Sequence, residues 1–100
     1  MEYTVEKDNI ILQLGTYMDA NSIQKQLQIL QLVVAAKKPV IVQAQDVKRL
    51  DSSSIQLLIS FQLTCESENI PISWQNPSFV FMDFIKVLGI EGLLKLNKSR

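Results

Sequence analysis

Residues 50–56 read Leu-Asp-Ser-Ser-Ser-Ile-Gln, and they lie where a buried strand is expected to give way to a helix. The four free N–H groups of a first helical turn, with the positive end of the helix dipole behind them, favour a phosphate at such a junction. The three serines therefore suit a helix cap, a phosphorylation switch, or both.

The segments on either side of this junction predict a strand and then a helix. Residues 39–44 (PVIVQA) are apolar at nearly every position, as expected of a central strand covered on both faces. A helix is expected from about residue 54 to residue 68. Its apolar positions at helical spacing are Leu57, Leu58, Phe61 and Cys65.

The N-terminal part predicts a hairpin followed by a helix. Residues 3–5 and 10–14 alternate apolar and polar side chains on either side of the turn-prone residues 7–9. Residues 19–22 (DANS) offer caps for an amphipathic helix. The apolar stripe expected along this helix consists of Ile23, Leu27, Leu30 and Val34.

The C-terminal part adds a short strand at residues 70–74, with Trp74 in the core, and a helix at residues 79–88 closed by Gly89. Residues 90–96 are short and ambiguous. The order of elements, β-β-α-β-α-β-α, predicts an α/β fold with right-handed crossovers. We expect a small, mostly parallel sheet of four to five strands with three to four helices, in a single domain over residues 1–100.

Composition narrows the classes of partner. The chain has 100 residues, of which 47% are hydrophobic and 20% charged, as in a soluble globular domain. Its formal net charge of zero argues against nucleic acid as a partner. The N-terminus lacks the basic start and apolar core of a signal peptide, and the apolar runs are too short to span a membrane. We expect a cytoplasmic protein without direct membrane insertion.

The residue types also exclude much enzyme chemistry. The sequence has no histidine and one cysteine, Cys65, which we expect in the core. No phosphate loop and no suitable carboxylate pair is present, so we expect no catalysis, no cofactor and no metal. Asp19, Asp46 and Asp51 all lie near predicted strand-to-helix turns and are expected to form a shallow acidic rim. A small enzyme or nucleotide-binding module at this rim is the remaining alternative from another class.

Within the serine run, Ser53 and Gln56 have the spacing of a capping box, in which Ser53 caps the helix and the glutamine reaches back to the cap amide. Ser52 then lies one residue outside the helix, exposed and free of capping duty. It is the natural modification site, although a serine run at a helix start can also serve as a cap alone.

The predicted helix at residues 79–88 is apolar around most of its circumference, more than one buried stripe needs. The residues responsible are Phe79, Phe81, Met82 and Phe84. The excess surface predicts a partner, including a second copy of the chain in a homodimer, or a covering by the C-terminal segment.

Residues 47–58 (VKRLDSSSIQLL), together with the overall organisation, resemble the sulfate transporter and anti-sigma factor antagonist (STAS) family. In that family an acidic residue, a hydroxyl residue, a small residue and a glycine join a central strand to a helix. The matching positions here are Asp51, Ser52, Ser53 and Ser54. Ser54 departs from the glycine usual in the bacterial antagonists. Residues 76–77 and 87–90 resemble the segments before and after the family's final helix.

The resemblance implies a non-enzymatic, anti-sigma factor antagonist-like domain. Its partner would be a serine kinase, often also the anti-sigma factor, that phosphorylates Ser52 and is released by that phosphate. Asp19 resembles the acidic residue of the family's first strand-to-helix loop. The partner-binding residues implied are Asp19, Asp51, Ser52, Ser53, Ser54 and Gln56. The alternative is a constitutive small cytoplasmic subunit of a lipid-transporting ABC system, bound to its ATPase through the same face, or a chemotaxis-associated scaffold.

Overall fold

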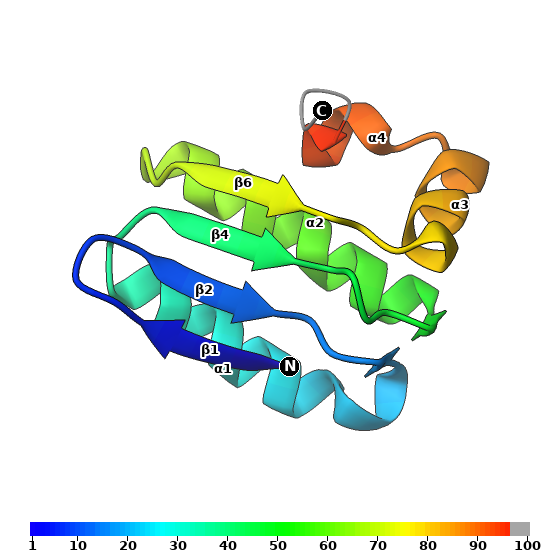
Figure 1. The fold of residues 1–100 in the computed structure, drawn as a ribbon, viewed down its shortest axis with the longest axis horizontal. Coiled ribbons are helices and arrows are strands. Elements are labelled where there is room, and N and C mark those ends of the chain that lie inside the picture. The colour runs from blue at the N-terminus through cyan, green and yellow to red at the C-terminus, as the bar shows by residue number, and fades with distance from the viewer. Residues whose placement is uncertain (97–100) are drawn as a thin grey trace.

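A four-stranded sheet forms the centre of the computed structural model, which describes residues 1–96 (Figure 1). Its strands in spatial order are β1 (Glu2–Val5), β2 (Ile10–Gln13), β4 (Val40–Gln43) and β6 (Ile72–Gln75). The β1–β2 pair is an antiparallel hairpin, and the β2–β4 and β4–β6 pairs are parallel. The predicted α/β fold with a mostly parallel sheet is confirmed.

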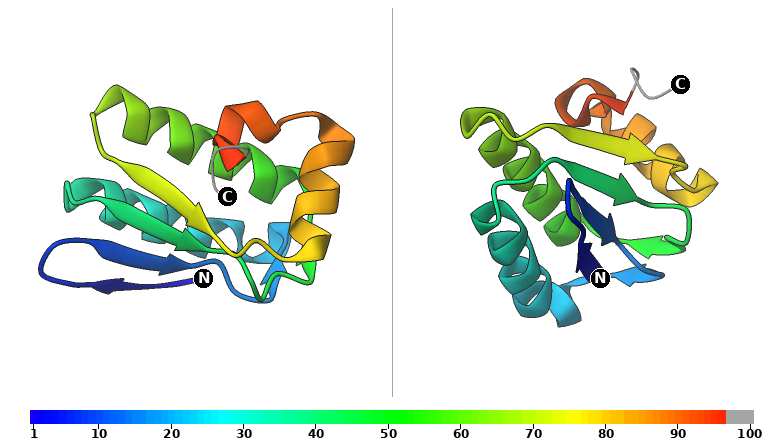
Figure 2. Two further views of the ribbon diagram at one scale, coloured as in Figure 1. Left: turned by 45° about the horizontal axis from the view of Figure 1, so that its top comes forward. Right: turned by 60° about the vertical axis from the view of Figure 1, so that its left-hand side comes forward.

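One face of the sheet is covered by α1 (Ile23–Ala35) and α2 (Ser52–Ser67), as the views in Figures 1 and 2 agree. Strand residues that point toward these helices, such as Leu12 and Val42, are fully buried. On the opposite face, Ile41 and Gln43 are only half-buried. The expectation that residues 39–44 are covered on both faces is therefore wrong, because both long helices pack on the same side.

The outer face carries a ladder of glutamine side chains across three strands. Gln13 Nε2 donates to Gln43 Oε1 at 3.2 Å, and Gln43 Nε2 donates to Gln75 Oε1 at 3.5 Å. The register places these three residues in one row. Their amide groups bond to one another, which suits a sheet face without a covering helix.

The buried face of α1 differs from the predicted stripe. The structure buries Gln26, Ile29, Leu30 and Val33, whereas Leu27 is 37% exposed. Burial of Gln26 is tolerated because its Nε2 donates to Ser22 Oγ at 2.9 Å and to the Asp19 carbonyl at 3.3 Å. These two bonds offset part of the cost of burying the side chain, whose Oε1 has no partner in the described part of the chain.

A second, two-stranded sheet was not predicted. It pairs β3 (Tyr17–Met18) with β5 (Arg49–Leu50) in parallel. The pair extends into the next residue, where the Asp51 amide donates to the Met18 carbonyl at 3.1 Å. These short strands therefore bring the loop before α1 alongside the start of α2.

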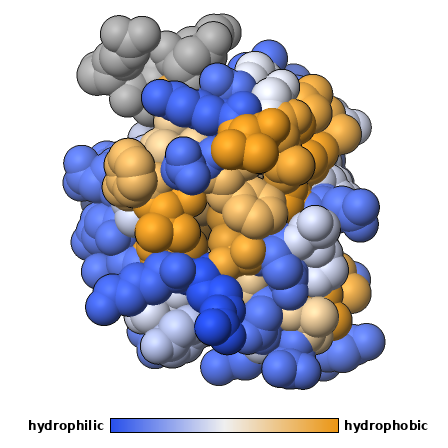
Figure 3. Space-filling view, turned by 90° about the vertical axis from the view of Figure 1, so that its right-hand side faces the viewer, coloured by the Kyte–Doolittle hydropathy of each residue, from blue (hydrophilic) through white to orange (hydrophobic). Residues whose placement is uncertain are grey.

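The C-terminal part contains α3 (Phe79–Leu88) and α4 (Glu91–Leu94), which confirms the predicted helix and assigns the segment after it. Gly89 ends α3 with φ 70°, the left-handed cap expected there. Phe81 and Ile85 are buried, and Trp74 lies in the core as predicted. Apolar side chains nevertheless gather on the outer side of the molecule that Figure 3 shows. Within residues 1–96, no helix is both long and apolar enough to cross a membrane.

Candidate functional site

The carboxylate of Asp51 organises the start of α2. Its Oδ1 accepts hydrogen bonds from the Ser54 amide at 3.1 Å and from the Ser53 hydroxyl at 2.8 Å. Its Oδ2 accepts a hydrogen bond from the Ala20 amide at 2.8 Å. One side chain therefore caps α2 and ties it to the 3-10 turn Ala20–Ser22 that precedes α1.

This arrangement corrects the predicted cap. Asp51, with extended backbone angles of φ −124° and ψ 174°, is the N-cap, and α2 begins at Ser52. Ser53 instead donates its hydroxyl to the Asp51 carboxylate. Gln56 is exposed and is not among the groups that cap the helix in the described part of the chain. Aspartate and serine are equally good N-caps. The Ser53–Gln56 spacing therefore placed the predicted N-cap two residues C-terminal to the observed one.

The hydrogen bonds at this carboxylate affect its acidity. The Ser54 amide, and after it the Ser53 hydroxyl, lower the pKa of Asp51 below its ordinary value of 3.8. Each of these donors stabilises the ionised form. The start of α2 therefore carries a fixed negative charge at neutral pH.

Ser52 is exposed, as predicted, but it lies inside the first turn of α2 instead of one residue before the helix. Its hydroxyl takes no part in the hydrogen bonds that join Asp51, Ser53 and Ser54. The amides of a first helical turn point out of this end, and of these the Ser54 amide is already held by Asp51. A phosphate on Ser52 would therefore stand close to both helix amides and a carboxylate.

The remaining predicted residues divide between this site and its surroundings. Asp19 caps the 3-10 turn, its Oδ1 accepting from the Asn21 amide at 3.1 Å, and the hydrogen bond from the Ala20 amide to Asp51 places this turn beside the start of α2. Ser54 is fully buried, and its side chain does not reach the surface. Asp46 is exposed in the turn before β5. The Ala20 amide joins the site without any signal in the sequence, because a backbone N–H has no residue-type signature.

Two further features lie away from this end. Burial, with a smaller effect from the charge of Glu66, raises the pKa of Cys65 to about 11, which makes this thiol a core group and not a nucleophile. A search of residues 1–96 finds no cluster of side chains suited to a metal ion.

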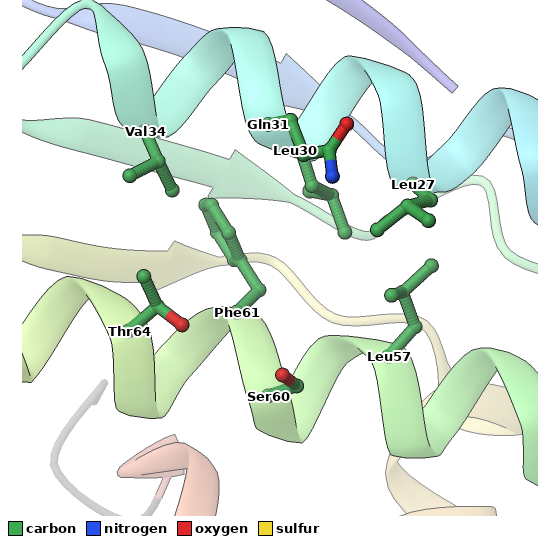
Figure 4. A pocket seen from close by; sticks show the side chains of 8 residues that line it. All are labelled: Leu27, Leu30, Gln31, Val34, Leu57, Ser60, Phe61 and Thr64. Atoms are coloured by element: carbon green, nitrogen blue, oxygen red, sulfur yellow. The ribbon is translucent and has the colours of Figure 1, made fainter.

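A shallow groove of about 280 Å³ runs between α1 and α2 (Figure 4). Apolar side chains such as Leu27, Leu57 and Phe61 line it from the two facing helices. Its polar lining residues are Gln31, Ser60 and Thr64, and none of the lining residues is charged. The groove thus offers packing surface, and its lining holds no acid or base that could activate the Ser60 or Thr64 hydroxyl.

Comparison with known proteins shows which domain family and which solved structure this chain resembles. A family model described as "Mlab, STAS domain" matches residues 1–95. The solved structure titled "Crystal Structure Analysis of Mglu" is similar over 78% of this chain, with a TM-score of 0.67 and 15% identity. The match covers 20% of that chain, and at this identity it shows the fold alone. A search of curated protein sequences finds no match.

Proposed function

The chain belongs to the STAS domain family, a family of regulatory protein-interaction domains, and we propose that its partner binds the start of α2 and is released by phosphorylation of Ser52. The partner in this proposal is a serine kinase, such as an anti-sigma factor with kinase activity, in the cytoplasm. The chain is the substrate of that kinase and not itself an enzyme.

The observation that carries the proposal is the exposure of the Ser52 hydroxyl beside the bonded Asp51 carboxylate. A partner kinase can reach an exposed hydroxyl, whereas the Ser53 hydroxyl is engaged with Asp51 and Ser54 is buried. The proposed contact surface comprises Ser52 together with Asp19, Asp51, Ser53 and Gln56. Ser54 supports that surface from inside the helix.

Local charge supplies the proposed switch. A phosphate adds about 1.5 to 2 negative charges and attracts the first-turn amides. It also repels the neighbouring Asp51 carboxylate and competes with it for the Ser54 amide. A phosphate that displaces the Asp51 carboxylate from the Ser54 amide also weakens the hydrogen bond between Asp51 and the Ala20 amide. One modification therefore alters both the start of α2 and the turn before α1.

A second candidate is a constitutive subunit, such as a small component of a lipid-transporting ABC system bound to its ATPase, or a chemotaxis-associated scaffold. The observation that favours it is that the Asp51 carboxylate already caps α2 through the Ser54 amide, so the helix has an N-cap without a phosphate. In that case Ser52 is a docking group only. Binding to the ATPase that survives Ser52→Glu would favour this candidate.

Incubating the full chain with ATP and the partner serine kinase of this proposal is expected to add one phosphate, at Ser52, as measured by intact mass and peptide mapping. Ser52→Ala is expected to remain unmodified. Ser60→Ala serves as the matched control and should still gain one phosphate, because Ser60 is an exposed serine of α2 outside the proposed contact surface. A wild-type chain without added mass, or a phosphate that persists in Ser52→Ala, would contradict the proposed switch.

A further inference from the structure

The outer face of α3 leaves several large apolar side chains exposed to solvent. Phe79 is 84% exposed and Val87 is 77% exposed, although both are fixed on a regular helix. We define the α3 patch by its exposed apolar residues, which are Phe79, Val80, Val87, Leu88 and, from α4, Leu93. Figure 3 shows apolar side chains gathered over this side of the molecule, with hydrophilic residues around them.

The size of the α3 patch fits an interface between proteins. A large aromatic side chain presents about 150–250 Å² when fully exposed, so at the observed exposures the patch offers on the order of 500 Å². The largest apolar patch on a typical monomer is about 300–600 Å² and is often functional. A standard interface uses about 800 Å² from each partner, which the patch supplies together with a polar rim.

Two charged residues lie beside Phe79 and Val87 on the surface of α3, and they indicate which partner fits. Asp83 and Lys86 are both exposed and lie three residues apart, so they are neighbours on the helix surface. Neither belongs to the ion pairs found within residues 1–96. Opposite charges in this order are self-complementary, because an antiparallel second copy of α3 places each Asp83 opposite Lys86 of that copy.

We propose that the α3 patch is a homodimer interface, in which the α3 helices of two copies pack antiparallel about a two-fold axis between Asp83 and Lys86. Phe79 then lies over the Gly89 end of the second α3. That end is open, since no described atom lies within 4 Å of the position a Gly89 side chain would occupy, helix-neighbouring residues aside. The interface does not use Ser52, so the homodimer and the proposed switch can fail independently.

Sedimentation equilibrium of the full chain across a wide concentration range tests this homodimer. The wild type is expected to approach twice its 11.4 kDa chain mass at high concentration. Asp83→Lys and Lys86→Asp each place like charges opposite one another, and each is expected to raise the dimer dissociation constant at least about tenfold. An equimolar mixture of the two variants should recover tight association, because every facing pair then has opposite charges. The double variant Asp83→Lys/Lys86→Asp should recover it for the same reason.

Two apolar substitutions complete the test. Phe79→Ala removes the largest exposed side chain and is expected to weaken the dimer about thirtyfold. Leu63→Ala on α2, where Leu63 is 51% exposed, should leave it unchanged. Circular dichroism confirms that each variant is folded.

A wild type that stays monomeric up to millimolar concentration overturns the homodimer and leaves the patch to a different protein. A dimer that withstands both charge substitutions, or a mixture that does not recover association, overturns the antiparallel arrangement.

Discussion

Phe81→Ala is expected to lower the free energy of unfolding by about 3–5 kcal/mol. Phe81 is fully buried, and its ring stacks on Trp74 with centroids 5.7 Å apart and planes inclined by 27°. The substitution removes this contact and leaves a cavity where α3 meets the sheet. Urea unfolding followed by Trp74 fluorescence and circular dichroism measures the change.

Phe79→Ala is the matched control for this substitution, because it removes the same side chain from the same helix. Phe79 is 84% exposed, so its removal should change the free energy of unfolding by no more than about 0.5 kcal/mol. The comparison is made at concentrations below self-association, where a dimer does not add to stability. Equal decreases in the free energy of unfolding for Phe81→Ala and Phe79→Ala would contradict the packing of α3 described above.

Asp51→Ala is expected to cost about 2 kcal/mol, because it removes an N-cap and leaves three donors without their acceptor. The donors are the amides of Ser54 and Ala20 and the hydroxyl of Ser53. Asp46→Ala, which changes an exposed turn carboxylate, should cost no more than about 0.5 kcal/mol. If Asp51→Ala were as mild as Asp46→Ala in urea unfolding, Asp51 would not be the cap.

The contribution of the Asp51 charge depends on pH in a defined direction. Its pKa is lower in the folded state than the ordinary value of 3.8, so folding favours the ionised carboxylate. This stability is fully present above about pH 3.8 and is lost as the pH falls through the folded pKa. Asp51→Asn keeps a capping oxygen without the charge. The difference in free energy of unfolding between wild type and Asp51→Asn should therefore be constant near neutrality and should become smaller below about pH 3.8.

Elements governed by local signals were predictable from the sequence. The hairpin follows from two alternating segments around a turn, and Gly89 ends α3 in the left-handed conformation that glycine tolerates best. The parallel order of the later strands follows from the helices between them. The region of the site was predictable because an acidic residue and three serines stand at one strand-to-helix junction.

Features that depend on distant contacts were not predictable in the same way. Gln26 is buried with its Nε2 donating to the Asp19 carbonyl and to Ser22 Oγ, although its Oε1 has no partner in the described part of the chain, and helical periodicity does not reveal such contacts. The cap shifts from Ser53 to Asp51 because the carboxylate reaches both the Ser54 amide and the turn before α1. Aspartate and serine have the same preference for the N-cap position, so the sequence alone does not distinguish Asp51 from Ser53 as the cap.

Titration calorimetry of the proposed partner serine kinase against the unmodified and the Ser52-phosphorylated chain tests the central claim most directly. We expect the phosphorylated form to bind at least about 100-fold more weakly, because its charge is added beside Asp51 and within the proposed contact surface. Ser52→Glu should show a smaller loss in the same direction. Equal affinities of the two forms would contradict a phosphorylation switch at the start of α2.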